Sequence, residues 1–465
     1  MPPDLTPPPE TTDPARRQVD LAAAKAAIRH LLDDGRVVEA AARLADLHPS
    51  DAADLLEDLP GTDERVSLVE ELPPAAAAAA LAEIDPEAEP ERILGGLDPA
   101  FAGRVVARLA SDDAADLLGQ LRSARRRAVL AAVPGELARG LRDLLRYPED
   151  SAGGIMSTEL LAVPASLSAG EAAAEVRRQA RRIGEVLYQV FVTDEGGLLQ
   201  GVLGLHELVL ADPATPLREL AASPAAMVGP DADQEEAARR LHHYDLPSLP
   251  VVQDGRLLGH VTWDDVMDVL EEEQTEDILR LAGTDPAESV RGDWAGAVRG
   301  RLPWLFVNLG TGALAALVVY LYQDTIDQLV ILAAIMPLIA GLGGNAGTQA
   351  LAVTVRRLTL DRDVGPERWR VAGKELLVGF TNGAVLGLVV GAVGLVWQGS
   401  AVFGLVVLLA MWGNLVVASF AGALVPVVLD GIGVDPAVAS AVFVTTFTDL
   451  AGFFLLLGLA SAWLV

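Results

Sequence analysis

The sequence predicts a multidomain membrane protein in which an acidic, water-soluble part precedes a bundle of five membrane-spanning helices. The 465-residue chain has a formal net charge of −29, of which −26 precedes residue 302 and only −3 follows it. The last third contains uncharged stretches long enough to cross a bilayer. The expected parts are a disordered tail, an all-α superhelix, an α/β module, a connecting helix and a membrane domain (1–20, 21–147, 148–270, 271–301 and 302–465).

The composition disfavours several functional classes. The chain contains no Cys, which excludes disulfides, thiolate zinc sites and Cys nucleophiles. Its acidity disfavours nucleic acid, whose phosphates would be repelled, and makes small cations the natural partners. No nucleophile–base set, P-loop or dinucleotide-binding fingerprint is present in the sequence, so an enzyme is not expected. Residues 1–20 are proline-rich and polar, without the pattern of a signal peptide, and predict a disordered tail.

Residues 21–147 are expected to be helical, because apolar residues recur at intervals of three and four between short breaks containing Pro or Gly. The segment Ser50–Leu59 is echoed by Asp112–Leu121 at an offset of 62 residues. Such an echo predicts helices that stack in series as a superhelix. Asp112 and Asp116 share one face of the second copy, although an acidic face is most often simply solvated.

Residues 148–270 change to short β-branched runs separated by glycine turns. Two hairpin–helix units repeat there, with hairpins at Val190–Leu203 and Leu249–Thr262 and with Gly201 aligned to Gly259 at an offset of 58. Asp-Gly and Gly-Gly between apolar runs are strong turn signals. The segment therefore predicts an α/β module made of two similar units.

An acidic helix is expected directly after the second unit. Its acids at positions 264, 268, 271/272 and 276 recur at helical spacing, so they repel one another unless cations or a partner compensate. The run leads into the connecting helix and toward the membrane part. The neighbouring His242 and His243 would point in different directions on a helix, which disfavours a two-His metal site.

Five membrane spans are expected, at roughly 302–322, 328–350, 371–396, 403–429 and 437–464. Basic residues cluster before the first span and between the second and third, whereas the loops near residues 324 and 398 have none. This asymmetry places the acidic part and the N-terminus in the cytosol, and the odd number of spans places the C-terminus outside.

Polar residues within the spans indicate an ion path. Asp449 lies near the middle of the fifth span, where a charge is costly and usually marks an ion or proton pathway, the alternative being a structural hydrogen bond. Glu375 begins the third span beside Lys374 and fits an interfacial ion pair as well as a pore role. Glycines surround Asn345 in Gly341–Gln349, which fits either close helix packing or an unwound backbone offering oxygen ligands to Mg2+ or Ca2+.

Three segments carry a resemblance to a known family: Gly341–Gln349, Asp435–Asp449 and Pro148–Met156. They resemble segments of the MgtE family of magnesium channels, and the paired hairpin–helix units resemble a tandem CBS module. The resemblance covers roughly residues 40–465 and implies an MgtE N-terminal domain, a CBS pair, a plug helix and a five-span membrane domain. It also implies a homodimer whose two membrane domains form one cation pore.

The resemblance assigns roles within the membrane part. Asp449 corresponds to the carboxylate that binds hydrated Mg2+ in the pore, and Asp435 to a second metal position. Mg2+ gives up its waters reluctantly, so two symmetry-related Asp449 side chains are expected to hold the ion through its waters. The further pore candidates are Asn345, Thr445 and Glu375. One departure is Ala441–Val442, which stands where the family is expected to have Gly-Pro or Asn-Pro.

The resemblance also implies Mg2+ sites between the helical and CBS parts. The residues that match are Asp112, Asp116, Asp233, Asp245, Asp265, Asp268, Glu273, Glu276 and Asp277. Tandem CBS modules often bind adenosine nucleotides, and Thr262 with Asp265 fits the hydroxyl–acid pair that holds the ribose. The same pair equally forms a helix capping box, which needs no ligand.

The expected protein is therefore a homodimeric, Mg2+-gated Mg2+ channel of the bacterial plasma membrane, with Mg2+ as both substrate and regulator and with ATP as a second ligand to test. Mg2+ bridging the acidic faces would close the pore through the connecting helix. Two other functions stay open: a divalent-cation exporter coupled to Na+ or H+, and a nucleotide-sensing membrane regulator without transport. The expected partners are Mg2+, membrane lipid and a second copy of the chain, and no nucleic acid.

Overall fold

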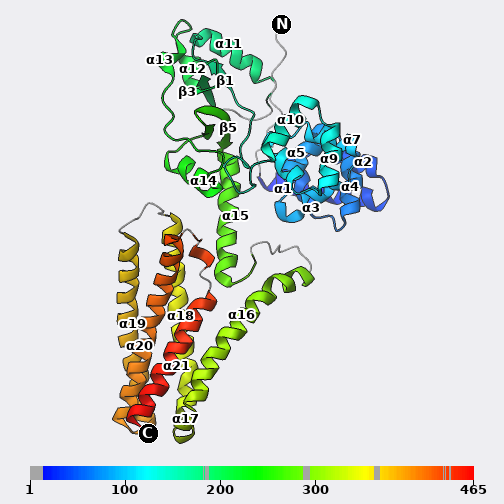
Figure 1. Ribbon diagram of the computed structural model, residues 1–465. Helices are drawn as coiled ribbons and strands as arrows, with labels where there is room; N and C mark the ends of the chain where they lie inside the picture. The colour runs from blue at the N-terminus through cyan, green and yellow to red at the C-terminus, as the bar shows by residue number, and fades with distance from the viewer. Residues whose placement is uncertain are drawn as a thin grey trace. The chain divides into compact units, whose positions relative to one another are not determined.

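The computed structural model describes residues 14–181, 183, 188–285, 294–360, 367–432, 434, 436–438 and 441–465 (Figure 1). The chain divides into two compact units, Met1–Glu271 and Glu272–Val465. The first unit holds short helices followed by an α/β module, and the second holds long apolar helices. The predicted fold class is thereby confirmed.

The first part of unit one is a series of short helices. They are α1 (Pro14–Asp33), α2 (Val37–Leu44), α3 (Pro49–Glu57), α4 (Thr62–Glu70), α5 (Pro74–Ala82), η1 (Pro86–Ala88), α6 (Pro90–Gly96), α7 (Pro99–Val106), α8 (Ser111–Gly119), α9 (Ser123–Ala132) and α10 (Gly135–Leu144). From α3 on, and with η1 and α6 taken as one step, a new helix begins every 12 or 13 residues. The 62-residue echo in the sequence therefore spans five such steps, from α3 to α8.

Two glutamates, on α3 and α4, tie their helices to turns further along the series. Glu57 Oε1 accepts a hydrogen bond from the backbone N–H of Asp85 at 2.9 Å, and Glu70 Oε1 accepts one from Asp98 N–H at 3.0 Å. Both links join residues 28 apart, so they follow from the repeat itself. Such bonds satisfy backbone groups at the turns between helices, which helix geometry alone leaves unpaired.

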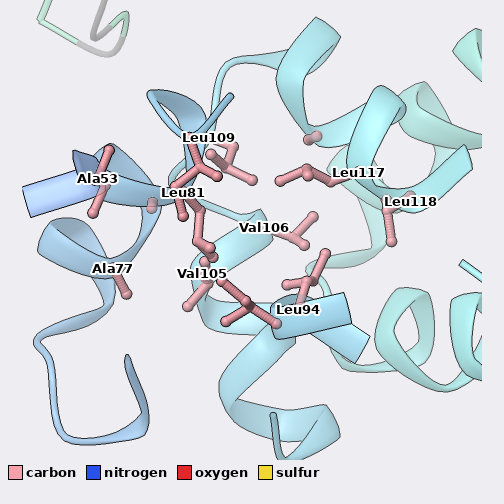
Figure 2. Packing of buried hydrophobic residues seen from close by; sticks show 14 of the residues in the cluster. Ala53, Ala77, Leu81, Leu94, Val105, Val106, Leu109, Leu117 and Leu118 are labelled. Carbon is pink, nitrogen blue, oxygen red and sulfur yellow. The ribbon is translucent and has the colours of Figure 1, made fainter. Parts of the chain in front are cut away.

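The faces between these helices are filled by Leu, Val and Ala. Figure 2 shows Leu81, Val105, Val106 and Leu118, from α5, α7 and α8, converging on one apolar interior. Leu118 and Val105 are fully buried. Because no single short helix can bury its apolar face alone, stacking in series is what makes the superhelix stable.

The α/β module contains two small sheets. In the first, β1 (Ala162–Pro164) pairs in parallel with β2 (Gln189–Thr193), which pairs antiparallel with β3 (Leu199–Gly204). In the second, β4 (Ser248–Gln253) and β5 (Arg256–Thr262) form the matching antiparallel hairpin. Helices complete the two units, namely α11 (Ala169–Gln179), α12 (Leu205–Leu210), α13 (Leu217–Leu220) and α14 (Gln234–His243).

The α/β module is joined directly to the helical series. The backbone N–H and the hydroxyl of Thr158 lie 2.8 and 3.0 Å from Ser111 Oγ, at the first residue of α8. One apolar cluster runs through both parts, since it contains Leu118 of α8 together with Met156 and Val266. These contacts fix the start of α8 against the module.

The acidic run lies on α15 (Trp263–Ala282), and the next residue, Gly283, adopts the left-handed conformation, φ +73°. The connecting helix predicted at 271–301 therefore comprises the last turns of α15 and the first turns of the next helix, α16 (Trp294–Leu321). The glycine, which adopts positive φ without a steric penalty, accounts for the stop.

Five helices in the described part of the chain are long and apolar enough to cross a membrane. They are α16, α18 (Ile331–Leu360), α19 (Glu367–Gln398), α20 (Ala401–Gly431) and α21 (Ala441–Trp463), with the short α17 (Gln323–Gln328) and η2 (Pro436–Val438) in connections. Within this unit Figure 1 shows α18 to α21 as a bundle.

Glycines allow α19 and α20 to meet backbone to backbone. A Cβ added at Gly383, Gly387 or Gly391 would lie 2.7–2.9 Å from a carbonyl oxygen of α20. Real Cβ atoms do not approach carbonyl oxygens so closely, so no larger residue fits without separating the helices. Small residues at such crossings are a common device in membrane bundles, where van der Waals packing drives helix association.

Candidate functional site

A cluster of carboxylates lies where α8 meets the start of α15. Asp112 and Asp113 occupy the first turn of α8, and Asp265 the first turn of α15. Asp112 is buried, with 7% of its surface exposed, whereas Asp264 and Asp268 are exposed at the rim. The cluster therefore combines the buried Asp112 with the half-buried Asp113 and Asp265 and with an opening to solvent.

Burial and mutual repulsion raise the proton affinity of this cluster. Burial, and after it the negative charges of Asp265, Glu83, Asp264 and Asp268, raise the pKa of Asp113 to about 7. Burial likewise raises the pKa of Asp265, although hydrogen bonds from the hydroxyl and backbone N–H of Thr262 oppose the rise. These charges on Asp113 all come from acids, so the cluster favours a bound cation or protons.

The remaining cytosolic residues predicted from the sequence lie elsewhere. Asp116 is half-buried one turn after Asp112. Asp233 is the N-cap of α14, where its Oδ1 accepts the backbone N–H of Glu235 at 2.9 Å. Asp245 follows α14 in a left-handed conformation, φ 49°. Further along α15, in the second unit, are Glu273, Glu276 (which pairs with Arg280) and Asp277.

The sequence reasoning missed two members of the cluster, Asp113 and Glu83, and it placed Asp264 in the acidic run without assigning it to a metal site. Glu83 continues the 13-residue spacing of Glu57 and Glu70, so the repeat could have placed it near the start of α8. Its Oε2 accepts a hydrogen bond from Ser50 Oγ at 2.6 Å. Across the described residues, no three Asp, Glu or His side chains are already gathered tightly enough to hold a metal ion.

The predicted pore residues lie on α18 and α21. Thr445 and Asp449 are one turn apart on α21 and are half-buried, and Asn345 on α18 is exposed. The two helices are close at this level, because a Cβ added at Gly344 would lie 3.6 Å from Cγ2 of Thr445. Asp435 lies outside the described residues.

The glycine-rich segment of α18 is helical, and the alternative of an unwound backbone is not found. Its glycines serve close packing: a Cβ added at Gly347 would lie 2.3 Å from Cγ1 of Val444. The side chain of Glu375 is 8% exposed on α19, and its Oε1 lies 3.7 Å from Lys374 Nζ. This distance is compatible with the interfacial ion pair.

Comparison with known families divides the chain as its structure does. Residues 336–459 match the model of a divalent cation transporter family, MgtE. Residues 47–150 match the MgtE intracellular N domain, and residues 152–213 and 217–272 each match the CBS domain.

Curated relatives and a solved structure are similar to large parts of this chain. The chain is 37% identical to the magnesium transporter MgtE of Enterococcus faecalis over 71% of this chain and 72% of the relative. It is 38% identical to that of Thermus thermophilus over 68% and 71%. The solved cytosolic domain of the Mg2+ channel MgtE in complex with ATP is 34% identical, with a TM-score of 0.49 and coverage of 53% of this chain and 99% of that one. The chain is therefore a multi-pass membrane protein that belongs to the MgtE family of magnesium transporters.

Proposed function

We propose that this chain is a Mg2+-gated Mg2+ channel of the bacterial plasma membrane that closes when cytosolic Mg2+ binds between α8 and α15. The observation that carries the gating proposal is the cluster around the half-buried Asp113, whose pKa is raised by burial and by the negative charges of Asp265, Glu83, Asp264 and Asp268. A divalent cation would remove this repulsion and draw the two helices together. Without the ion, the same repulsion favours separation of the helical series from the α/β module.

Mg2+ can shift this equilibrium only by its difference in affinity between the assembled and the separated states. The proposed ligands are the cluster itself, with Asp112, Asp113, Asp265 and Asp268 at its centre. Asp116, Asp233, Asp245, Glu273, Glu276 and Asp277 are proposed as ligands of further weak sites. Several weak sites that act together would make the response to cytosolic Mg2+ steep.

The pore is proposed to lie at α18 and α21 of two copies of the chain. Asn345, Thr348 and Gln349 are exposed on α18, within the apolar part of the helix. Exposed polar side chains are costly in lipid and usually face a partner helix or a water-filled path. A second copy packed on this face would cover them and bring two Asp449 side chains together, with Thr445, Glu375 and Asp435 at further pore positions.

The pore assignment is tested by Mg2+ flux into liposomes. Asp449→Ala should abolish Mg2+ conduction, because its carboxylate would no longer hold the hydrated ion. Asp324→Ala, which changes an exposed acid on α17, should conduct as the wild type does. Normal Mg2+ selectivity in Asp449→Ala would exclude this pore. Flux that requires a Na+ or H+ gradient would instead favour a coupled exporter.

The gating assignment is tested by proteolysis of the full chain with and without millimolar Mg2+. Mg2+ should protect the loops around α8, and combined Asp113→Asn, Asp265→Asn and Asp268→Asn changes should remove the protection. Glu136→Gln alters a side chain that is 97% exposed on α10 and should leave the protection intact. Equal cleavage of the wild type with and without Mg2+ would contradict the switch.

ATP is proposed as a second ligand at Thr262 and Asp265. The Thr262 hydroxyl donates to Asp265 Oδ2 in a helix cap, so ribose hydroxyls would compete for the same carboxylate. Calorimetry with ATP should show binding that Thr262→Val weakens. ATP affinity without any Mg2+ flux would favour the nucleotide-sensing regulator.

A further inference from the structure

A buried asparagine lies at the centre of the membrane bundle. Asn414 on α20 is fully buried. Its Nδ2 donates a hydrogen bond of 2.9 Å to the carbonyl oxygen of Ile339 on α18. Its Oδ1 is buried and has no hydrogen-bond partner among the described residues. One amide side chain therefore links α20 to α18 with only part of its hydrogen-bonding capacity used.

Two glycines make room for this amide on two different helices. A Cβ added at Gly343 of α18 would lie 2.3 Å from Asn414 Nδ2, and one added at Gly452 of α21 would lie 2.9 Å from the same atom. Asn414 thus occupies the point where α18, α20 and α21 meet. Gly343 is two residues from Asn345, and Gly452 is three residues from Asp449.

We propose that Asn414 is a positioning residue that fixes α18 against α21 and so sets the spacing of the side chains along the ion path. This inference rests on the proposed function in one respect, the assignment of the path to α18 and α21. The contact itself is independent of that assignment. Asn414 is buried, so its effect on the ion is indirect.

Stability alone gives a poor account of an asparagine at this place. An unpaired buried oxygen costs free energy, and interhelical hydrogen bonds in membranes stabilise only weakly. A leucine of similar size would avoid that cost. The amide differs from a leucine in that its N–H donates a hydrogen bond to the Ile339 carbonyl oxygen. This directional bond fixes the turn of α18 that begins at Ile339 and leads into the glycine-rich segment.

The absence of Cys from the chain allows a direct test of position. A Cβ at Gly344 would lie 3.6 Å from Thr445 Cγ2, so Gly344→Cys with Thr445→Cys should form a disulfide between α18 and α21 in the full-length protein. Adding Asn414→Leu should slow disulfide formation about threefold, the ratio expected for loss of one interhelical hydrogen bond. The matched control is Asn382→Leu, an exposed asparagine on α19, which should leave the rate unchanged. An unchanged rate with Asn414→Leu would overturn the proposal.

A second pair of variants separates the hydrogen bond from simple volume. Gly343→Ala should slow the cross-link by forcing Asn414 aside. Combining Gly343→Ala with Asn414→Ala removes the clash but also the donor, so the rate should stay low. Full recovery in the double variant would show that only volume matters and would overturn the role of the amide.

Flux measurements then connect position to selectivity. Asn414→Leu channels in liposomes should lose about threefold in the ratio of Mg2+ to Ca2+ flux, as expected if one hydrogen bond sets the spacing. A residue needed only for folding would lower both fluxes and keep their ratio, which would overturn the inference. Failure of the proposed pore would be recognised separately, by normal flux in Asp449→Ala while the cross-link still responds to Asn414.

Discussion

Asp113→Asn is the sharpest perturbation of the cytosolic cluster, because it replaces an ionisable carboxyl by a neutral group of the same shape. The pKa of Asp113 is raised to about 7 from an ordinary value of 3.8, mainly by burial and then by four neighbouring acids. The folded state therefore binds a proton more tightly than the unfolded state. The contribution of Asp113 to the free energy of unfolding is at its full value below about pH 4 and is lost as the pH rises through about 7.

The shift sets the size of the expected effect. A pKa difference of this magnitude between the folded and unfolded states corresponds to a loss of at most about 4 kcal/mol in the free energy of unfolding between pH 4 and pH 8. Because the cluster opens to solvent at its rim, solvent screening reduces this loss, and we expect a loss of about 2 kcal/mol in the free energy of unfolding. At pH 5 the variant should already be somewhat more stable, because the folded Asp113 is protonated whereas the unfolded aspartate, with its ordinary pKa of 3.8, is ionised, but the difference should be smaller than at pH 8. At pH 8 without Mg2+ the variant should be more stable by about 2 kcal/mol.

The assay is urea unfolding of residues 14–285, followed by circular dichroism at pH 5, 6.5 and 8 without Mg2+. The expected gain at pH 8 moves the midpoint by roughly 0.5–1 M urea. Glu136→Gln, on the exposed surface of α10, should follow the wild type at each pH. If the two midpoints differed equally at pH 5 and pH 8, or did not differ at pH 8, the assigned repulsion would be refuted.

Three further predictions concern other parts of the fold. Burial lowers the pKa of His260, so the neutral imidazole stabilises the fold above about pH 6.5, and this stabilisation is lost as the pH falls below that value. His260→Leu should therefore reduce the loss of stability toward urea between pH 6.5 and pH 5. Leu118→Ala should cost about 2–5 kcal/mol in the same urea assay, because Leu118 is fully buried. Gly391→Leu should lower the melting temperature in detergent, because a Cβ there would lie 2.7 Å from Gly404 O, whereas Gly373→Leu, with nothing within 4 Å, should not.

The membrane helices could be predicted well from the sequence, and the period of the helical series could not. Uncharged runs are long and end at charged or polar residues, so the spans follow from composition. In the helical series the turns differ in sequence, since some helices begin at Pro and others at Thr, Ser or Gly. Only the sequences of α3 and α8, which lie five helix repeats apart, are similar enough for the repeat to be recognised.

The site was partly predictable for a different reason. Asp112, Asp265 and Asp268 were found through a family motif, whereas the roles of Asp113 and Glu83 became visible only when the chain was folded. Asp233 and Asp245 show that a motif match can also assign a metal site where a structural reason suffices, because an aspartate at a helix end is favoured by backbone geometry alone. Their positions at the two ends of α14 satisfy that preference before any metal is considered.

The excess negative charge of the cytosolic part cannot act as a sensor as a whole. Some acids already have local partners: Asp54 pairs with Lys25, Asp58 with Arg29, and Glu57 and Glu70 accept backbone N–H groups. Such acids would keep similar partners if α8 and α15 separated as the proposed gating requires, so Mg2+ would gain no differential affinity from them. The repulsion of Asp113 on α8 by Asp264, Asp265 and Asp268 on α15 differs, because it exists only while the two helices are together. Under the proposed gating, the switch would therefore depend on these few residues, and neutralising them should remove the response to Mg2+ while most of the surface charge remains.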